Sequence, residues 1–562
     1  MSGHYRQLPL LAEALMTATA NWSEEIDASH GEVFTRRWVV DLILDLAGYE
    51  AKTDLASQTI IEPSCGGGAF VAPIVERLLA SMTTHNRSFE DLRGSLRAFD
   101  LLRHNVEISR KGAESALLAA GCQADLATDL AASWIQSADF LLDDHEAASA
   151  DFVVGNPPYI RLEDVPTEVS DEYRRRWPTM RGRSDIYIGF YEKGLELLKP
   201  EGKLAFICAD RWMRNQYGGH LRKLISDRYS MDSVIVMHDV DAFEEQVSAY
   251  PAITVLRSGK QKAVQIVEAN GALDEASANP LPLWASSPRR KALKSEAFSA
   301  ARIPNWFEGP GLWPSGSPEN LELLADLEKR FEPLENAETG TRVGIGVASG
   351  CDELYLTKED LDIEADRLLP MLTSADITSG KVDWSGTSLV NPWNDDGLVD
   401  LAEYPKLDRY LKKHKKRIGG RHVAEKNPKA WYRTIDRVTP GLTDRPKLLL
   451  PDMKSAAHPV LDPGGFYPHH NLYYVVSDSW NLEVLGGLLL SDFANLFVGA
   501  YCVKMRGGTY RFQAQYLRTI RVPKPDSLDI NTEKQLVAAF RNRDATAATE
   551  AATVAYGIQL RA

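Results

Sequence analysis

The sequence predicts an α/β protein: a mostly parallel, twisted sheet with helices on both faces, followed by a mixed α/β domain. Three observations support this fold class. Between residues 35 and 257, short apolar segments alternate with segments whose apolar residues recur at helical spacing. Several of the short segments end in polar or glycine-rich turns, as strands do at the ligand-binding edge of an open α/β sheet. After residue 300, the apolar segments shorten, and basic and aromatic residues are mixed.

The elements of the first part follow in a regular order. Thr35 is a candidate N-cap for a helix with an apolar face, and Gly48 is placed to end that helix. Further helices are predicted over residues 70–79 and 186–198, and strands are predicted to end near residues 61, 100, 139, 154, 208, 243 and 257. The sheet is therefore expected to end near Arg257.

The length of 562 residues exceeds what one core supports, so two or three domains are expected. We assign residues 1–257 to a catalytic domain. Residues 258–300, which are polar and rich in Ser, Ala and Pro, are read as a linker, and residues 301–562 as a second domain. The Ala/Thr-rich tail near 544–553 is predicted to be a last helix.

Composition narrows the class of protein. No run of about 20 apolar residues is present, so no membrane span is expected, and the N-terminus lacks the pattern of a signal peptide. The five cysteines are scattered without a CxxC pair, which argues against a disulfide framework and against a zinc site. We therefore expect no metal and a reducing, cytoplasmic compartment.

One loop carries the most specific chemistry. Asn156, Pro157, Pro158 and Tyr159 follow a short buried strand, which the two prolines cannot continue. The amide oxygen of Asn156 and the carbonyl of Pro157 can accept both protons of an –NH2 group, which localises its lone pair and makes it more nucleophilic. The ring of Tyr159 offers a surface for a flat heterocycle. The loop is therefore predicted to activate an amine on a planar group.

A glycine-rich turn precedes this loop. Residues 62–68, Glu-Pro-Ser-Cys-Gly-Gly-Gly, connect a strand to a helix, an arrangement that brings backbone N–H groups close to a ligand. The spacing matches neither GxGxxG nor a P-loop, and Glu62 would repel phosphates, so an amino-bearing ligand is favoured. Asp100 ends the next strand and is placed for the two hydroxyls of a ribose. Asp139 and Phe140 suit the amino group and the ring of an adenine.

The net charge of −14 conceals a local excess of positive charge. Residues 406–437 contain twelve Lys or Arg against three Asp or Glu. Basic residues interleaved with aromatic ones suit phosphates and bases of nucleic acids. The residues predicted to bind DNA are Lys412, Lys413, Lys415, Lys416, Arg417 and Arg421.

With these motifs in this order, the chain resembles the γ group of amino-group DNA methyltransferases, the TaqI-like adenine-N6 enzymes. EPSCGGGAF is similar to their cofactor loop, GNPPY to their catalytic loop, and GEVFT to the N-terminal segment that closes over the methionine moiety. DAFEEQVSAYPAI is similar to the segment whose aromatic residue, here Phe243, stacks on the flipped base. The family usually has proline after the threonine of its first motif, whereas this chain has Arg36.

The resemblance implies a Rossmann-like S-adenosylmethionine-dependent methyltransferase domain followed by a DNA target-recognition domain. It implies methyl transfer to N6 of a flipped adenine in double-stranded DNA, by a monomer in a bacterial or archaeal cytoplasm. A cognate restriction endonuclease encoded separately is compatible with it. The residues it assigns to the cofactor are Thr35, Glu62, Pro63, Ser64, Cys65, Gly66, Gly68, Phe70, Asp100, Asp139, Phe140 and Asn156.

The sequence is also compatible with other functions. Cytosine-N4 methyltransferases present the same kind of amine but more often have serine at the position of Asn156. Release-factor glutamine methyltransferases share Asn-Pro-Pro-Tyr but are much shorter, and RNA base methylation is a further alternative. A DNA-specificity subunit without catalysis would need neither the glycine turn nor the Asn156 loop. No convincing nuclease motif is present.

Overall fold

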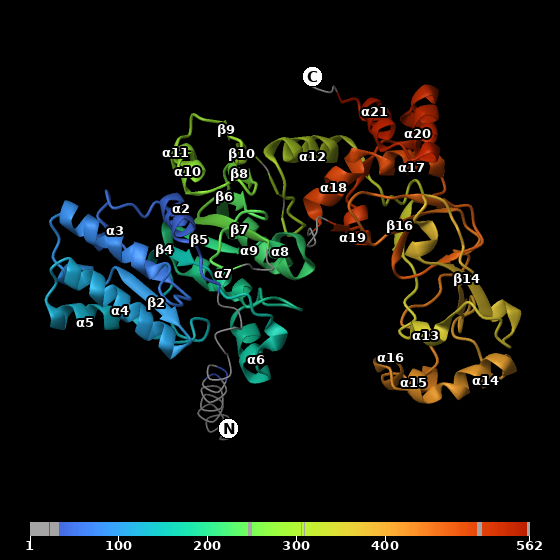
Figure 1. The fold of residues 1–562 in the computed structure, drawn as a ribbon, viewed down its shortest axis with the longest axis horizontal. Coiled ribbons are helices and arrows are strands. Elements are labelled where there is room, and N and C mark those ends of the chain that lie inside the picture. The colour runs from blue at the N-terminus through green and yellow to red at the C-terminus, as the bar shows by residue number, and fades with distance from the viewer. Residues whose placement is uncertain are drawn as a thin grey trace, which may run out of the picture. The chain divides into compact units, whose positions relative to one another are not determined.

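The structure is a computed structural model that describes residues 19, 22, 33–245, 250–304, 306–307, 309–502 and 509–558. The chain divides into two compact units, Met1–Glu322 and Leu323–Ala562. In the sequence, this division falls within helix α12 (Pro318–Arg330), which is labelled in Figure 1.

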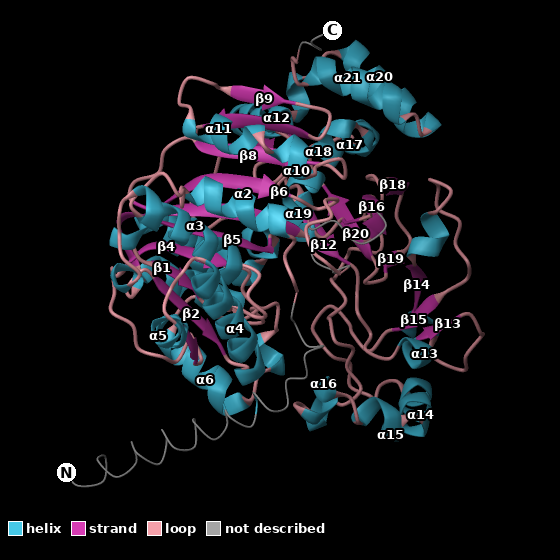
Figure 2. Cartoon of the chain, turned by 60° about the vertical axis from the view of Figure 1, so that its left-hand side comes forward, coloured by secondary structure: helices cyan, strands magenta, loops and turns pink. Residues whose placement is uncertain are grey.

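Ten strands of the first unit form one sheet in the order β3-β2-β1-β4-β5-β7-β6-β8-β10-β9 (Figure 2). The strands are β1 (Ile60–Glu62), β2 (Leu96–Asp100), β3 (Ile135–Ser137), β4 (Ala150–Gly155), β5 (Leu198–Ala209), β6 (Tyr229–Val236), β7 (Pro251–Ser258), β8 (Val264–Ala269), β9 (Ala292–Lys294) and β10 (Phe298–Ile303). The first five are parallel, whereas β7 runs antiparallel between β5 and β6. The strand order reverses between β1 and β4, where open α/β sheets bind ligands.

Alternate side chains of the central strands enter two different cores. Phe152 and Val154 of β4 belong to the same core as the helices α2, α3, α4 and α5. Val153, between them, lies instead against Gly194 of α7. Because successive side chains of a strand point to opposite faces, helices cover both faces of the sheet, as predicted. The helices of this unit are α2 (Arg37–Ala47), α3 (Val71–Thr84), α4 (Arg103–Ala119), α5 (Ala124–Trp134), α6 (Thr167–Arg176), α7 (Tyr187–Glu196), α8 (Arg211–Arg214), α9 (Gly219–Arg228), α10 (Glu275–Ala278) and α11 (Pro280–Ser286).

The prediction of a linker over residues 258–300 is wrong, and so is the prediction that the sheet ends near Arg257. Strands β8, β9 and β10 extend the sheet to Ile303, and α10 and α11 contact α2. Leu281 and Trp284 are buried in the core shared with α2. The segment is polar because its strands and short helices each bury only one side, so that the residues on the other side face solvent.

The second unit is built from short strands and small helices. Its strands are β11 (Glu332–Pro333), β12 (Arg342–Ile345), β13 (Leu356–Thr357), β14 (Leu368–Leu372), β15 (Ser388–Val390), β16 (Lys447–Pro451), β17 (Met453–Lys454), β18 (Val460–Asp462), β19 (Tyr467–Pro468), β20 (Leu472–Val476), β21 (Tyr510–Arg511) and β22 (Arg521–Val522). Two of its sheets have four strands, in the orders β12-β20-β16-β18 and β13-β15-β14-β19. This mixture of elements is the one that the sequence predicted.

Small helices complete the second unit, which Figure 1 colours from yellow to red. They are α13 (Asp352–Tyr355), α14 (Pro405–Lys413), α15 (Lys415–Gly419), α16 (His422–Glu425), α17 (Leu482–Leu490), α18 (Asp492–Tyr501), α19 (Ala514–Leu517), α20 (Ile530–Asn542) and α21 (Ala545–Ala555). The last of them confirms the helix predicted for the Ala/Thr-rich tail. Among the described residues no single helix is long and apolar enough to cross a membrane, and α17 with α18 passes that test only as a pair bent by 62°.

Candidate active site

A cavity opens at the C-terminal ends of the parallel strands of the first unit, beside the point where the strand order reverses. The structure brings most of the predicted site residues together in its lining. Those residues are Thr35, Pro63, Ser64, Cys65, Gly66, Phe70, Asp100, Asp139, Phe140, Asn156 and Pro158. They come from five separate stretches of the chain, so the cavity is a product of the sheet and not of one motif.

Five predicted residues do not line the cavity: Glu62, Gly68, Pro157, Tyr159 and Phe243. Pro157 is buried, and the ring of Tyr159 meets the ring of Tyr187 edge to face, with centroids 6.4 Å apart. Phe243 is 5% exposed and packs in the core beside α2. For Phe243 to stack on a base, as predicted, its ring would have to become accessible from this buried position.

The glycine turn is held by contacts to its neighbours. The Gly66 N–H donates to Asp100 Oδ2 over 2.8 Å, and the Ser109 hydroxyl donates to the Gly66 carbonyl over 2.8 Å. Gly66 has a φ of +49°, which glycine adopts without cost, and no atom lies within 4 Å of where a Cβ would stand on it. A ligand can therefore approach the backbone closely at this point.

Glu62 lies at the end of β1, behind the lining. Its side chain is fully buried, and Oε1 accepts a hydrogen bond from the Ser64 N–H over 3.2 Å. Oε2 is buried and has no hydrogen-bond partner among the described residues. Burial raises the pKa of this carboxyl well above its usual value. An unpartnered buried carboxylate oxygen is costly, and a bound cation would relieve that cost.

Gly155 makes room for this carboxyl. A Cβ on Gly155 would stand 2.4 Å from Glu62 Oε1, too close for any real contact. The glycine before Asn156 is therefore required by the packing of Glu62 against the catalytic loop. This contact joins the two motifs that the sequence identified separately.

The amide of Asn156 has a fixed orientation. Its Nδ2 donates to the Val33 carbonyl over 2.9 Å and to Thr35 Oγ1 over 3.2 Å. A backbone carbonyl can only accept, so the nitrogen must face Val33. The other amide atom, Oδ1, is buried and has no partner among the described residues. The side chain thus presents one free acceptor.

Thr35 was predicted to cap the helix that follows it, and this prediction is wrong. The N-cap of α2 is Arg36, and no side chain caps the helix. The Thr35 hydroxyl accepts instead from Asn156, a contact between residues 121 positions apart. The prediction that Gly48 ends the helix is confirmed by its left-handed φ of +86°.

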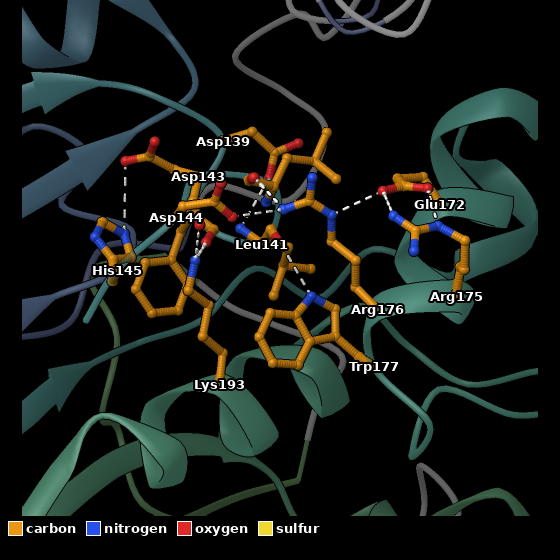
Figure 3. Close-up of polar contacts among 12 residues, drawn as sticks. Asp139, Leu141, Asp143, Asp144, His145, Glu172, Arg175, Arg176, Trp177 and Lys193 are labelled. Atoms are coloured by element: carbon orange, nitrogen blue, oxygen red, sulfur yellow. Dashed lines mark hydrogen bonds and ion pairs between the residues drawn. The ribbon is translucent and has the colours of Figure 1, made fainter. Parts of the chain in front are cut away.

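Asp139 and Phe140 form another wall of the cavity. Figure 3 shows Asp139 with the residues of α6 and α7 that lie around it, among them Arg176 and Lys193. The Tyr173 hydroxyl of α6 donates to Asp139 Oδ2 over 2.6 Å. Lys193 of α7 donates to the carbonyls of Phe140 and Asp143, and its ammonium lies 4.6 Å from the centre of the Phe140 ring. Burial lowers the pKa of Lys193 to about 8. These contacts fix the wall without a ligand.

Several further residues that the sequence did not predict line the cavity. They are Trp22, Val33, Phe34, Ala69, Leu101, Leu102, Ala138, Ile160, Tyr173, Ile186 and Phe190. Most are apolar residues in positions that also fit a core, so no local signal marks them. Val33 and Phe34 lie in the GEVFT motif, of which only the threonine was assigned a role, and Gly31 and Glu32 of that motif lie outside the described residues.

Comparison with known proteins identifies the family. Residues 85–243 match the model of the Eco57I restriction-modification methylase family. The chain is 43% identical to the Type II methyltransferase M.PaeR7I of Pseudomonas aeruginosa over 556 residues, which cover 98% of this chain and 95% of that protein. It is 40% identical to M.XhoI of Xanthomonas vasicola over 94% of this chain and 97% of that protein.

The chain belongs to the Type II methyltransferases. A solved structure supports the fold of this methyltransferase: the Type IIL restriction-modification enzyme MmeI, in complex with DNA, has a TM-score of 0.56 at 12% identity, covering 93% of this chain and 74% of that one. The resemblance to DNA methyltransferases of restriction-modification systems is thus confirmed.

The basic residues of the methyltransferase divide into two kinds. Lys412, Lys413, Lys415, Lys416 and Arg417 are exposed on α14 and α15, and we call these five residues the basic patch. Arg421 differs, because its guanidinium donates to the carbonyls of Ile418, Ser349, Trp431 and Arg433. The assignment of Arg421 to DNA binding is therefore not supported, because its guanidinium is already hydrogen-bonded to backbone carbonyls of the protein.

Neutralising Lys412, Lys413, Lys415 and Lys416 with alanine is expected to weaken binding of the methyltransferase to DNA. Each lysine that meets a phosphate contributes about 0.9 to the slope of log K against log salt, so the slope should flatten by up to about four. Fluorescence anisotropy at several salt concentrations measures it. The matched control replaces four exposed lysines elsewhere in the same unit, Lys358, Lys381, Lys524 and Lys534. Equal slopes for both quadruple variants would show that the patch is only solvated.

One group of side chains in the second unit has the residue types of a metal site. Asp352, His469 and His470 have potential ligand atoms within 4.8 Å of one another, the one such group of three among the described residues. His469 Nε2 lies 3.2 Å from Asp352 Oδ2, which an ordinary hydrogen bond explains. Within the residues that the structure describes, the second nitrogen of His469 has no hydrogen-bond acceptor of the kind that usually orients a metal-bound histidine.

Proposed function

We propose that this methyltransferase transfers a methyl group from S-adenosylmethionine to N6 of an adenine extruded from double-stranded DNA. The cavity of the first unit is the proposed site. The observation that carries the proposal is the orientation of the Asn156 amide. Val33 and Thr35 hold its nitrogen, and its buried oxygen has no hydrogen-bond partner among the described residues. An exocyclic amine could donate the hydrogen bond that this acceptor does not receive from the part of the chain that the structure describes.

The residues present fit the cofactor. Glu62 has a carboxylate oxygen without a hydrogen-bond partner in the described part of the chain, which suits an ammonium group. The open space at Gly66 suits close approach of a ligand to the backbone. Asp100 and Asp139 are the proposed partners of a ribose and an adenine amino group, and Phe140 of the adenine ring. When bound, S-adenosylmethionine would supply a methyl group that its sulfonium centre activates for transfer.

The chain's own residues would then prepare the amine. Asn156 Oδ1 and the Pro157 carbonyl would each accept a hydrogen bond from one of the two N–H groups of the amine, which concentrates the lone pair on its nitrogen. The loop is held in place before any substrate arrives, so little reorganisation is needed at the moment of reaction. Tyr159 and Phe243 are the proposed stacking partners of the extruded base.

DNA as the substrate is supported from two sides. The relatives are Type II methyltransferases, and MmeI was solved in complex with DNA. The basic patch offers exposed positive charge on a chain whose net charge is −14. We propose that residues of the second unit recognise the target sequence, that the enzyme acts as a monomer in the cytoplasm, and that a separate restriction endonuclease shares its site.

Long-read detection of modified bases in DNA from cells that express this chain tests the proposal. N6-methyladenine at one recurring sequence is the expected result. N4-methylcytosine at one sequence would replace adenine by cytosine as the target, and the amine-accepting role of Asn156 would stand. Unmodified DNA, together with a methylated protein or RNA, would overturn DNA as the substrate.

Replacing Phe243 with leucine is expected to reduce methylation of a paired target more than that of a mispaired one. Leucine keeps most of the buried volume and removes the ring. Stacking is worth about 1–3 kcal/mol per base, so the rate on paired DNA should fall by about 5- to 150-fold. A mispaired base costs less to extrude and depends less on stacking. Single-turnover rates on the two duplexes measure this, and an equal loss on both would indicate a general packing defect.

A further inference from the structure

Residues 33–36, here called the N-terminal strip, contact three parts of the proposed site: the cofactor cavity, the Asn156 amide and residues 241–244. Val33, Phe34 and Thr35 line the cofactor cavity. The Phe34 ring lies 3.4 Å from where a Cβ would stand on Gly67, so it rests on the glycine turn. A ligand in the cavity would therefore meet the strip directly.

The same strip holds the catalytic asparagine. Both contacts of Asn156 Nδ2 go to it, one to the Val33 carbonyl and one to the Thr35 hydroxyl. Among the described residues these are the two partners of the Asn156 side chain. The direction in which Oδ1 points is therefore set by the position of the strip.

The strip also pairs with residues 241–244, here called the stacking segment because it contains Phe243. The Arg36 N–H donates to the Ala242 carbonyl over 3.0 Å, and the Glu244 N–H donates to the Phe34 carbonyl over 2.9 Å. Thr35 and Phe243 thereby form an antiparallel bridge. Arg36 also forms an ion pair with Asp241 over 2.6 Å, but these side chains are 40% and 80% exposed, so the backbone bonds contribute more.

Arg36 makes one of these bonds possible. Proline, the usual residue of the family at this position, has no N–H to donate. Arg36 has a φ of −60° and ψ of 143°, values that proline also adopts. The backbone at Arg36 is therefore one that proline could adopt, but without the bond to the stacking segment.

We propose that the N-terminal strip couples cofactor binding to capture of the target base. A cofactor that contacts Val33 to Thr35 would immobilise the strip, and the paired stacking segment and the Asn156 amide would be immobilised with it. Cofactor and extruded base then bind cooperatively, and by linkage each raises the affinity of the other by the same factor. Thr35 and Arg36 are positioning residues in this arrangement. The proposal rests on the proposed function.

Replacing Arg36 with proline tests the coupling. The ring carbon of proline would stand where the N–H now points at Ala242, so the pairing must open while α2 still starts normally. Arg36→Ala is the matched control, because it removes the ion pair with Asp241 and keeps the N–H. Both variants are compared with the wild type by thermal unfolding.

The experiment measures the affinity of the full-length protein for a DNA duplex, with and without S-adenosylhomocysteine. The duplex carries the target sequence identified by long-read detection of modified bases. In the wild type and in Arg36→Ala, the ligand should tighten DNA binding by a factor in the range of about 5 to 150, typical of such coupling. In Arg36→Pro this factor should fall close to one, while the affinity for S-adenosylhomocysteine alone changes little. An Arg36→Pro protein with the wild-type coupling factor would overturn the inference.

Hydrogen exchange on the wild-type protein provides a second test that needs no variant. Addition of S-adenosylhomocysteine should slow exchange of the Arg36 and Glu244 amides as well as those of the glycine turn. Protection of residues 62–68 alone would contradict the coupling. If the duplex is methylated but shows no cooperativity, the coupling fails and the proposed function stands; if no DNA is methylated, the proposed function itself fails.

Discussion

Replacing Asn156 with alanine is expected to slow methyl transfer to DNA by about 10²- to 10³-fold while the protein still folds. The substitution removes the buried Oδ1 acceptor, and with it the interaction that favours attack by the amine. Loss of one preorganised hydrogen-bonding group of this kind lowers kcat by about 10²- to 10³-fold. Single-turnover methylation of the cognate duplex measures the effect, and calorimetry measures the affinity for S-adenosylhomocysteine, which should stay near the wild-type value.

Two further variants separate the acceptor from the scaffold. Asn156→Ser restores a small acceptor and should recover part of the lost rate. Thr35→Val keeps Oδ1 but removes one of the two groups that hold the amide, so its loss should be smaller than that of Asn156→Ala. If Asn156→Ala methylates DNA as fast as the wild type, the amine is activated by other residues.

The parts of the site that the sequence predicted are those set by local chemistry. Two consecutive prolines end β4 whatever the rest of the chain does, and glycines mark the turn after β1. The identity of their partners depends on tertiary contacts. Thr35 looked like a helix cap because threonine often is one, yet its hydroxyl binds Asn156 from far along the chain.

The errors in the fold have a similar cause. Residues 258–300 lack the long apolar runs of β4 and β5, because β9 pairs on one side only and the helices α10 and α11 bury few residues each. The structure of this segment depends on the antiparallel pairing of β8 with β10. A single sequence does not show which strands pair with each other. Arg421 is a related case: its charge suggested DNA, whereas the carbonyls around it show a role in the fold.

Replacing Glu62 with glutamine is expected to weaken cofactor binding strongly. In the proposed site the carboxylate meets an ammonium group, and hydrogen bonds between charged groups are worth about 1.5–3 kcal/mol, or about 10- to 150-fold in affinity. Calorimetry with S-adenosylhomocysteine measures the loss. Glu107→Gln, an exposed residue of α4, makes the same change of charge away from the cavity and should bind as the wild type does.

The pH dependence of the Glu62→Gln variant distinguishes a buried charge from a packing effect. Burial raises the pKa of Glu62 in the folded protein, so the folded state favours the neutral acid. The free energy of unfolding of the wild type should therefore fall as the pH rises from the pKa of Glu62 in the unfolded chain toward its pKa in the folded protein, by about 1.4 kcal/mol per pH unit. The variant, which cannot ionise at this position, should show no such fall. Wild-type affinity for S-adenosylhomocysteine should rise over the same range, because the ammonium favours the ionised carboxylate, and should fall only where the ligand's own ammonium loses its proton. A variant that matches the wild type in both profiles would remove Glu62 from the cofactor site and leave it only a packing role against Gly155.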